Sequence, residues 1–483
     1  MKSLKINVLL NTLRSVLNII FPLITFPYVS RILGADNLGI YNFSSSFVSY
    51  FILIAGLGIN TYAIREGAKY RDNREEISNF SSEVFSINML STLIAYILLI
   101  TILLLFKNLQ DYTICIIIFS IQIFFSTIGT EWIYTIYEDY SYITLRSIVF
   151  KIISIFLLFV FVKNREDFLA YSAITVFSSV GSNILNYVHA KRFLQLNLTL
   201  KMKLKRHLKP IMILFVSGIA IQVYVSSDIT ILGIMKGTHT VGIYSVSSKI
   251  YSILKMLLSA ALVVYIPRLS MLFGKKQYKK YNTLASSVLN ITLMLIFPIS
   301  VGLILVSKEI VILLAGIKFI KSVSSLQLLS LAIIPTIFSW FYTDCVLIPA
   351  KKEKIVMIAN LISAVVNIIL TIILIPYFSE NAAAFTTVVA EVINMLIVVF
   401  YGIQVITIDY FRKNLLTVLV GTFGVIGICM AVDMLQFTFI YGLIVKILLS
   451  ILIYFIILLL LKNRYCISTF EKILGGFSLW KKE

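Results

Sequence analysis

The sequence predicts an all-α integral membrane protein with about fourteen transmembrane helices: two parallel six-helix lobes around a central cavity, followed by two extra C-terminal helices. Three observations favour this fold. The 483 residues are 59% hydrophobic and only 13% charged, and long apolar runs recur along the whole chain. Basic residues gather in alternate loops between those runs. Two short motifs each return after about 200 residues, which indicates a duplicated unit.

Each long apolar run predicts one helix, because an α-helix needs ~20 residues to cross a bilayer. A bilayer core admits only helices and closed barrels, and these runs are too long for barrel strands. The first run lacks a cleavage site of small residues, so we expect it to remain as a helix. The predicted spans are residues 8–30, 38–64, 81–106, 112–137, 141–163, 168–190, 209–235, 240–266, 283–306, 325–348, 354–378, 381–403, 414–433 and 438–461.

The net charge of +20 could indicate a nucleic-acid partner, but the placement of the charge argues against one. If the N-terminus lies inside, most basic residues fall on the inside, at residues 2–5, 65–74, 191–209, 268–280, 351–354 and 412–413 and in the C-terminal tail. Short loops rich in Lys and Arg stay in the cytoplasm. We therefore expect cytoplasmic termini, no nucleic-acid partner, and contact between the basic loops and anionic membrane lipids.

The two repeated motifs define the predicted lobes. LGIYNFSSS at residues 38–46 and VGIYSVSSK at residues 241–249 share five of nine positions, and WIYT from Trp132 returns as WFYT from Trp340. Chance similarity between apolar segments is the alternative, but both repeats are displaced by the same six predicted helices. Because six is even, both copies cross the membrane in the same direction. The expected domains are lobes at residues 1–193 and 209–408, a basic cytoplasmic linker at 194–208, and two further helices with a cytoplasmic tail at 409–483.

Polar residues on one face of the first span favour a water-filled cavity. Asn7, Asn11, Arg14 and Asn18 are spaced 4, 3 and 4 residues apart, which places them on one helical face. Arg14 lies about 10 Å into the span, at 1.5 Å per residue. Its side chain could instead extend back to the cytoplasmic surface.

The eighth span carries two lysines far from its ends. Lys249 lies near the midplane, where a charge costs ~2.5 kcal/mol or more unless it meets water, a counter-ion or an anionic ligand. Lys255 lies on the face that also carries Ser245, Ser248, Ser252 and Ser259. We expect both lysines to line the cavity and, with Arg14, to bind an anionic headgroup. Internal ion pairs are the alternative.

Two further spans and one carboxylate complete the predicted cavity. One face of the eleventh span carries Asn360, Ser363, Asn367 and Thr371, and one face of the twelfth carries Thr387, Glu391 and Asn394. The residues expected to contact sugar hydroxyls are Asn11, Asn18, Ser252, Asn360 and Asn367. Asp228, in the seventh span, and Glu391 could bind a coupling proton or cation, or could neutralise a lysine. Helix packing through hydrogen bonds is the alternative for each polar face.

The sequence carries no signature of an enzyme or a metal site. The G-x-S-x-G, P-loop and H-E-x-x-H motifs are absent. The four cysteines lack metal or redox spacing, and the chain has only three histidines, so we expect no histidine metal site. We therefore expect no catalytic residue, metal or cofactor; coupling to protons, to sodium or to the membrane potential stays open.

Four segments resemble Wzx-type oligosaccharide flippases of the multidrug/oligosaccharidyl-lipid/polysaccharide exporter superfamily, which includes lipid II flippases and multidrug extrusion proteins. The segments are RILGADNLGIYNFSSS from Arg31, GLGINTYAIRE from Gly56, EDYSYITLRSIVFK from Glu138 and DITILGIMKGTHTVGIYSVSSKI from Asp228. The similarity covers most of the chain and is strongest through about Leu269. One position departs, because Ile136 stands where the family often has glycine.

The resemblance implies a substrate and a mechanism. Such flippases move an oligosaccharide repeat unit on undecaprenyl diphosphate across the bacterial plasma membrane by alternating access, for capsule, O-antigen or a similar polysaccharide. In related lipid II flippases, basic residues on spans one, two and eight line the cavity. Arg14 and Lys249 match by helix and approximate depth, and Arg65 lies at the cytoplasmic end of span two. The two extra helices form a groove for the lipid tail in such proteins.

The resemblance also implies partners and leaves two rival functions. A polysaccharide polymerase and glycosyltransferases are implied partners, and a monomer is expected. A cation-coupled drug exporter of the same superfamily would have a cavity dominated by carboxylates and usually twelve spans. A membrane polysaccharide polymerase would need a large external loop with catalytic residues, and none is predicted.

Overall fold

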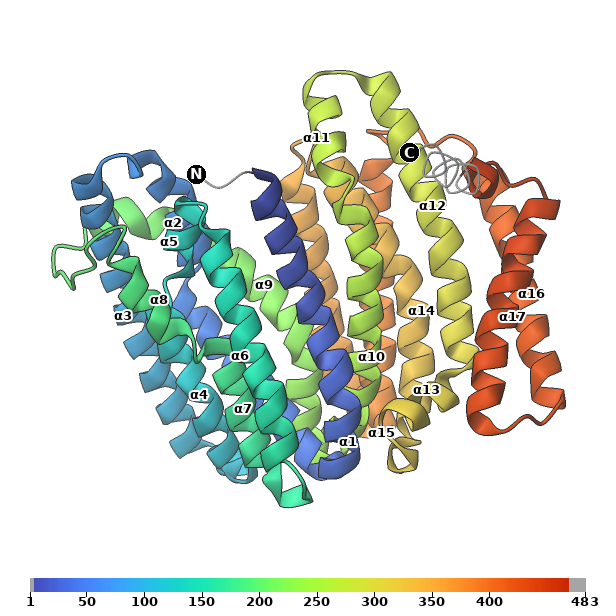
Figure 1. Ribbon diagram of the computed structural model, residues 1–483, viewed down its shortest axis with the longest axis horizontal. Coiled ribbons are helices and arrows are strands. Elements are labelled where there is room, and N and C mark those ends of the chain that lie inside the picture. Colours follow the sequence, from blue (N-terminus) through green and yellow to red (C-terminus); the bar gives the residue numbers. More distant parts are fainter. Residues whose placement is uncertain (1–3, 469–483) are drawn as a thin grey trace, which may run out of the picture. The chain divides into compact units, whose positions relative to one another are not determined.

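The computed structural model describes the backbone of residues 4–468 and the side chains of residues 20–216, 218–260 and 262–468. Every regular element in this part of the chain is a helix (Figure 1). The described residues form two compact units. One holds the residues up to 245 together with 371–380, and the other holds 246–370 and the residues from 381 onward.

Eleven helical segments of the described chain are long and apolar enough to cross a membrane. Two of them contain a break that divides a long helix: α1 (Leu4–Gly56) at Gly34, with φ 74°, and α15 (Glu353–Gly402) at Ser379, with φ 49°. A further helix, α10 (Thr238–Val263), is 26 residues long, which is also enough to cross. The described residues thus supply fourteen long helices, and the predicted all-helical membrane fold is confirmed.

The first unit is built around α1. Its other elements are α2 (Ile59–Gly67), α3 (Arg74–Leu105), α4 (Thr113–Ile128), α5 (Glu131–Ile136), α6 (Tyr140–Phe161), α7 (Phe168–Val180), α8 (Asn183–Ala190), α9 (Leu204–Lys236) and the start of α10. α1 packs against α3, α4, α6 and α9, while α7 packs against α4 and α6 (Figure 1). Asn73 begins α3, because its side-chain oxygen accepts from the backbone N–H groups of Glu75 and Glu76.

The glycines of the two G-I-Y motifs lie where α1 and the first turns of α10 touch. A Cβ atom on Gly39 would lie 1.8 Å from the carbonyl oxygen of Thr238, and one on Gly242 would lie 1.8 Å from that of Ala35. Each glycine therefore faces backbone of the other helix, and the two contacts are reciprocal. Only a residue without a side chain permits such a close approach. In both copies of the motif, the glycine is therefore required for the close packing of α1 against α10.

The segment that leads into α9 is fastened along α3 by a ladder of serines. Backbone N–H groups of Gln195, Asn197 and Thr199 donate to the hydroxyls of Ser78, Ser82 and Ser86, at 3.1, 3.1 and 2.9 Å. The spacings match, because four helical residues rise about 6 Å and two extended residues about 6.6 Å. We call residues 195–199 the strap.

A polar network around the buried Glu83 continues from the strap into the first turn of α9. The carboxylate of Glu83 lies 2.7 Å from Lys203 Nζ and 2.8 Å from His207 Nε2. The other ring nitrogen of His207 lies 2.7 Å from the hydroxyl of Tyr62. The His207 side chain is fully buried, so it has no access to water, and its two ring nitrogens are both paired. The start of α9 is thereby tied to α2 and α3.

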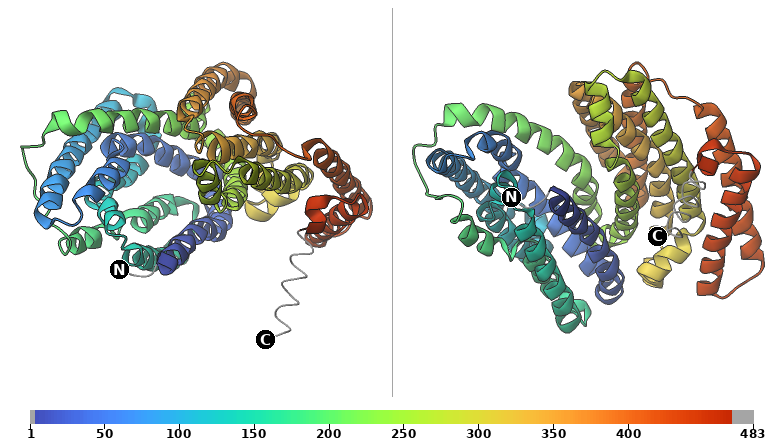
Figure 2. Two further views of the ribbon diagram at one scale, coloured as in Figure 1. Left: turned by 90° about the horizontal axis from the view of Figure 1, so that it is seen from above. Right: turned by 45° about the horizontal axis from the view of Figure 1, so that its top comes forward.

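The second unit contains most of α10 and the C-terminal helices. Its other elements are α11 (Ile266–Gly274), α12 (Tyr278–Leu305), α13 (Ser307–Leu314), α14 (Ser322–Trp340), a π-helical turn (Phe341–Leu347), most of α15, α16 (Phe411–Met434) and α17 (Phe439–Leu460). α12 packs against α14 and α16, and α16 and α17 pair with each other. Figure 2 shows α16 and α17 as a hairpin, the two red helices.

Candidate functional site

Lys255 lies in a cluster of aromatic and polar side chains on α10, α14 and α15. Its Nζ atom is 3.8 Å from Oε1 of Glu391, 5.0 Å from the ring centre of Tyr251 and 5.5 Å from that of Trp340. The Glu391 side chain is only 6% exposed, and that of Lys255 is 25% exposed. Ring faces and a carboxylate both favour a cation. The structure thus places Lys255 beside Glu391, one of the two carboxylates that the sequence offered as a counter-charge for a lysine, and such an internal ion pair was the alternative to headgroup binding.

The hydroxyl of Tyr251 lies between Thr336 and the carboxylate of this cluster. The hydroxyl of Tyr251 lies 2.8 Å from that of Thr336 and 3.5 Å from Oε1 of Glu391. Trp340, the first residue of the second W-x-Y-T motif, ends α14 directly before the π-helical turn. Trp132, the first motif's tryptophan, also lies at a helix break, after Thr130 with φ 40°. The repeated motif therefore lies at a helix break in both copies. In the second copy its tryptophan ring also packs against the ammonium group of Lys255.

Lys249 is half-buried on α10, six residues before Lys255. No hydrogen bond or ion pair joins its side chain to any other residue of the part that the structure describes. Six residues separate the two lysines by about 9 Å along the helix axis and turn them well away from each other around it. The structure therefore does not bring Lys249 into the Lys255–Glu391 cluster.

The predicted polar residues of α9 and α15 are buried or half-buried and make hydrogen bonds. Asp228 on α9 accepts a hydrogen bond from the hydroxyl of Tyr244 at 3.1 Å. Nδ2 of Asn394 donates to Oδ1 of Asn360 at 2.7 Å, and Asn367 is almost completely buried. Ser252, in contrast, is exposed, and its hydroxyl donates to the carbonyl of Ser248 at 2.7 Å. The side chains of Asn11, Arg14 and Asn18 lie outside the described residues.

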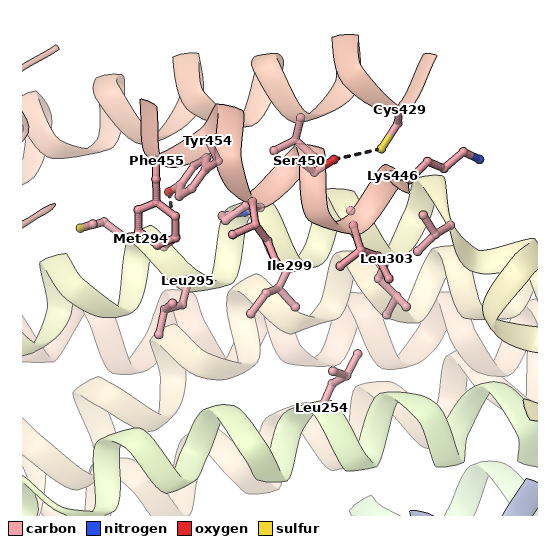
Figure 3. Close-up of a pocket in the computed structure, with 16 residues that line it drawn as sticks. Leu254, Met294, Leu295, Ile299, Leu303, Cys429, Lys446, Ser450, Tyr454 and Phe455 are labelled. Atoms are coloured by element: carbon pink, nitrogen blue, oxygen red, sulfur yellow. Dashed lines mark hydrogen bonds between the residues drawn. The ribbon is translucent and has the colours of Figure 1, made fainter. Parts of the chain in front are cut away.

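An apolar groove of about 510 Å³ lies within the second unit (Figure 3). Its walls come from α12, α16 and α17, with Leu254 of α10 on one side; Pro298, Ile299 and Leu303 are among the residues of α12 that line it. Tyr454 and Phe455 of α17 lie at one part of the groove and Lys446 at another (Figure 3). The groove fits a hydrocarbon chain, because its lining is almost entirely aliphatic and aromatic.

Lys446 ends the groove with an ion network that the sequence analysis missed. Its Nζ atom lies 2.5 Å from Oε1 of Glu309 and 2.6 Å from Oδ1 of Asp433, and its side chain is 4% exposed. The three residues belong to α17, α13 and α16, so the network ties the hairpin to α13. A lone lysine inside the most hydrophobic span was the available signal. Among the described side chains, no cluster of three His, Cys, Asp or Glu residues could hold a metal ion.

Comparisons with known protein families and sequences give two kinds of match. The profile of the family described as "Polysaccharide biosynthesis protein" matches residues 4–273, and that of MatE matches residues 214–373. A putative O-antigen transporter of Escherichia coli (strain K12) is 28% identical over 258 residues, which is 52% of this chain. The match spans 61% of that relative, less than two thirds of its length. A putative O-antigen transporter of Shigella dysenteriae is 24% identical over 405 residues, covering 81% of this chain and 98% of the relative.

Solved structures show the same fold. The lipid II flippase MurJ in an inward closed conformation aligns with a TM-score of 0.74 and 18% identity, covering 97% of this chain and 99% of that one. An inward-facing multidrug resistance transporter of the MATE family aligns with a TM-score of 0.58 and 13% identity, covering 80% and 93% of the two chains. Only the first of these alignments extends over nearly the whole chain, and therefore over α16 and α17.

Proposed function

Because the chain belongs to the polysaccharide biosynthesis protein family, we propose that it is a Wzx-type flippase that carries a lipid-linked oligosaccharide across a bacterial plasma membrane. The finer proposal is that the lipid is undecaprenyl diphosphate and that the sugar is a repeat unit of a surface polysaccharide. Two relatives named as putative O-antigen transporters support transport rather than catalysis. The chain itself is a multi-pass membrane protein. Cytoplasmic termini and alternating access between two lobes remain part of the proposal.

The observation that carries this proposal is the position of the apolar groove relative to the lysines of α10. Leu254 lines the groove, and the next residue, Lys255, belongs to the charged cluster with Glu391. One helix thus contributes to an apolar surface and to a polar one within about one turn. A polyprenyl diphosphate has the same division, because a hydrocarbon tail is joined directly to a doubly phosphorylated head. We propose that the tail lies in the groove and the head near α10.

The two lysines have different proposed roles. Glu391 already neutralises part of the charge of Lys255, so Lys255 with its aromatic neighbours serves to shape the site. Lys249 has no such partner among the described residues, and a lysine at this depth is costly without an anion. We therefore propose Lys249 as the main contact of the diphosphate, together with Arg14. Asn11, Asn18, Ser252, Asn360 and Asn367 remain proposed sugar contacts.

The energy source has two proposed forms. Asp228 is buried beside the hydroxyl of Tyr244, an environment in which a carboxylate can exchange a proton or hold a monovalent cation. Glu391 is better suited to the counter-charge role, because Lys255 lies beside it. Proton or sodium coupling through Asp228 is therefore proposed ahead of coupling through Glu391, and the membrane potential acting on the charged head is the other form.

The test replaces Lys249 by alanine in cells that depend on this chain for surface polysaccharide. Lys249→Ala should reduce surface polysaccharide at least tenfold, because truncating one partner of a buried charge pair costs about 2 kcal/mol or more. Lys249→Arg should keep part of the activity. Lys318→Ala, which changes an exposed lysine, is the matched control. The amount of protein in the membrane is measured for all variants, and wild-type polysaccharide with Lys249→Ala would refute the headgroup site.

Cells that lack this chain also distinguish the proposed flippase from a drug exporter. Loss of the chain should abolish surface polysaccharide and leave sensitivity to cationic drugs unchanged. Increased drug sensitivity with intact polysaccharide would favour the exporter, toward which the MatE match points.

A further inference from the structure

We propose that a basic pocket at one end of the α16–α17 hairpin binds the phosphate group of a membrane lipid. The pocket has a volume of about 130 Å³. It lies where α16 begins and α17 ends, and it shares no lining residue with the apolar groove. The residues that line it, called the basic pocket below, are Tyr410, Lys413, Asn414, Thr417, Lys462, Asn463, Arg464 and Tyr465.

The charge of the basic pocket has one sign. Lys413, Lys462 and Arg464 contribute three cations, and no Asp or Glu lines the pocket. No ion pair joins these three side chains to any residue within the described ranges. The nearest carboxylate along the chain, that of Asp409, is exposed and is not part of the lining. Three converging cations without a carboxylate are the complement of a phosphate.

The floor of the basic pocket is rigid. Nδ2 of Asn463 donates to Oδ1 of Asn414 at 2.8 Å and to Oγ1 of Thr417 at 2.6 Å. Oδ1 of Asn463 accepts from the backbone N–H groups of Tyr465 and Cys466, both at 3.1 Å. Both asparagines are buried. The end of α17 is therefore held on the first turns of α16, and the cations project from a fixed support.

One of the three cations is oriented by an aromatic ring. The guanidinium carbon of Arg464 lies 4.8 Å from the ring centre of Tyr410. Stacking on a ring occupies the face of a guanidinium and leaves its N–H edges free to donate. Those edges can bind two oxygens of one phosphate side by side.

The surroundings favour a lipid phosphate over a free one. Within two turns of the basic pocket, large apolar side chains on both helices are exposed, including Leu416 at 64% and Leu460 at 75%. In a membrane-spanning hairpin these side chains meet acyl chains, and the next polar layer is that of the lipid phosphates. An amphiphile can therefore place its chains on Leu416 and Leu460 and its phosphate among the cations. Basic pockets between transmembrane helices bind anionic lipids in this way.

The experiment measures lipid retention by the full chain in detergent with native mass spectrometry. The probes are dioleoyl phosphatidylglycerol, dioleoyl phosphatidylcholine, undecaprenyl phosphate and inorganic phosphate. The pocket variant is Lys413→Gln/Lys462→Gln/Arg464→Gln, in which all three side chains are exposed, so the buried asparagines stay intact. The matched control is Lys275→Gln/Lys279→Gln/Lys280→Gln, which removes the same charge from exposed lysines beside α11 and α12.

The wild type and the control should retain one phosphatidylglycerol in preference to phosphatidylcholine, and the pocket variant should lose that preference by about tenfold or more. Displacement of phosphatidylglycerol by undecaprenyl phosphate in the wild type and in the control, with no specific retention of either lipid by the pocket variant, would support the proposal and identify a polyprenyl phosphate as the preferred lipid. Equal retention by wild type and pocket variant would overturn it, as would an equal loss in the control. Complete displacement by inorganic phosphate would overturn the assignment to a lipid. The proposal does not rest on the cargo of the protein, so its failure leaves the Lys249 test unaffected.

Discussion

A single methyl group at Gly242 should separate α1 from the start of α10. In the structure, a Cβ atom at this position would lie 1.8 Å from the carbonyl oxygen of Ala35, 2.6 Å from its carbonyl carbon and 2.9 Å from its Cα. All three atoms are backbone, so no side chain can turn aside. Ordinary van der Waals contacts of a Cβ atom begin at 3.4 Å, and the two helices must therefore move apart by more than about 1 Å.

The magnitude follows from two opposing effects. Overpacking of a close contact costs about 1–3 kcal/mol, whereas alanine gains up to about 1 kcal/mol over glycine inside a helix. We expect Gly242→Ala to destabilise the contact between α1 and α10 by a net 1–2 kcal/mol, which changes its population by a factor of roughly 5–30. Gly427→Ala is the control, because nothing lies within 4 Å of a Cβ atom there and only the gain in helix propensity applies.

The assay is a cysteine cross-link across the same contact. Asp36 and His239 are exposed, and Oδ1 of Asp36 lies 3.2 Å from Nδ1 of His239, so Asp36→Cys/His239→Cys places two thiols beside Gly242. The four native cysteines are buried and give little background. A short bis-maleimide should cross-link the pair in the parent and in Gly427→Ala, and severalfold less in Gly242→Ala. Equal yields in all three backgrounds would refute the reasoning.

Three other predictions concern polar contacts. Glu391→Gln and Lys255→Met should each lower thermal stability in detergent, and the double variant should lose less than the sum, with a coupling energy of roughly 0.5–3 kcal/mol; strict additivity would contradict the pair. Ser82→Ala removes the acceptor of the Asn197 N–H group, so trypsin should cut faster after the exposed Lys201, two residues beyond the strap, and an unchanged cleavage rate would count against the ladder. Lys446→Met leaves two carboxylates without their cation and should cost about 1–3 kcal/mol of stability; an unchanged melting temperature would show that the network does not hold the hairpin.

The fold was predictable because lipid restricts the chain to few structures. Span length, the distribution of basic residues and the repeated motifs each depend on local composition, and they led to fourteen long helices. The contacts were less predictable, because they join residues far apart in sequence. The spacing of the serines at 78, 82 and 86 can be seen in the sequence. Their partners, however, are backbone N–H groups of a different segment, and no side chain in the sequence identifies that segment. The repeated glycines indicated duplication, while their close approach is a property of two helices together.

In the candidate site, too, local patterns could be predicted and contacts between distant residues could not. The helical face with Lys255 could be predicted from spacing, and Glu391 was one of two candidate counter-charges, but the pairing of the two joins helices more than a hundred residues apart in sequence and could not be predicted. Lys446 was overlooked although its sequence context is as unusual as that of Lys249, because it has no counterpart in the repeat. Lys249 is unusual in the sequence, because it lies near the middle of a predicted span. It is also unusual in the structure, because it forms no ion pair within the described residues.

The hydrogen bonds of the strap also limit the positions at which the connection between the predicted lobes can bend. Residues 195–199 are fastened to α3, and Lys203 and His207 are fastened to Glu83, so the connection between the two predicted lobes has almost no slack and cannot act as a loose tether. The next residue able to yield is Pro210, inside α9, which lacks the N–H group that would bond to the preceding turn. If the lobes rock, the bend would therefore lie inside the transmembrane helix α9. It would lie at Pro210, three residues after the buried His207.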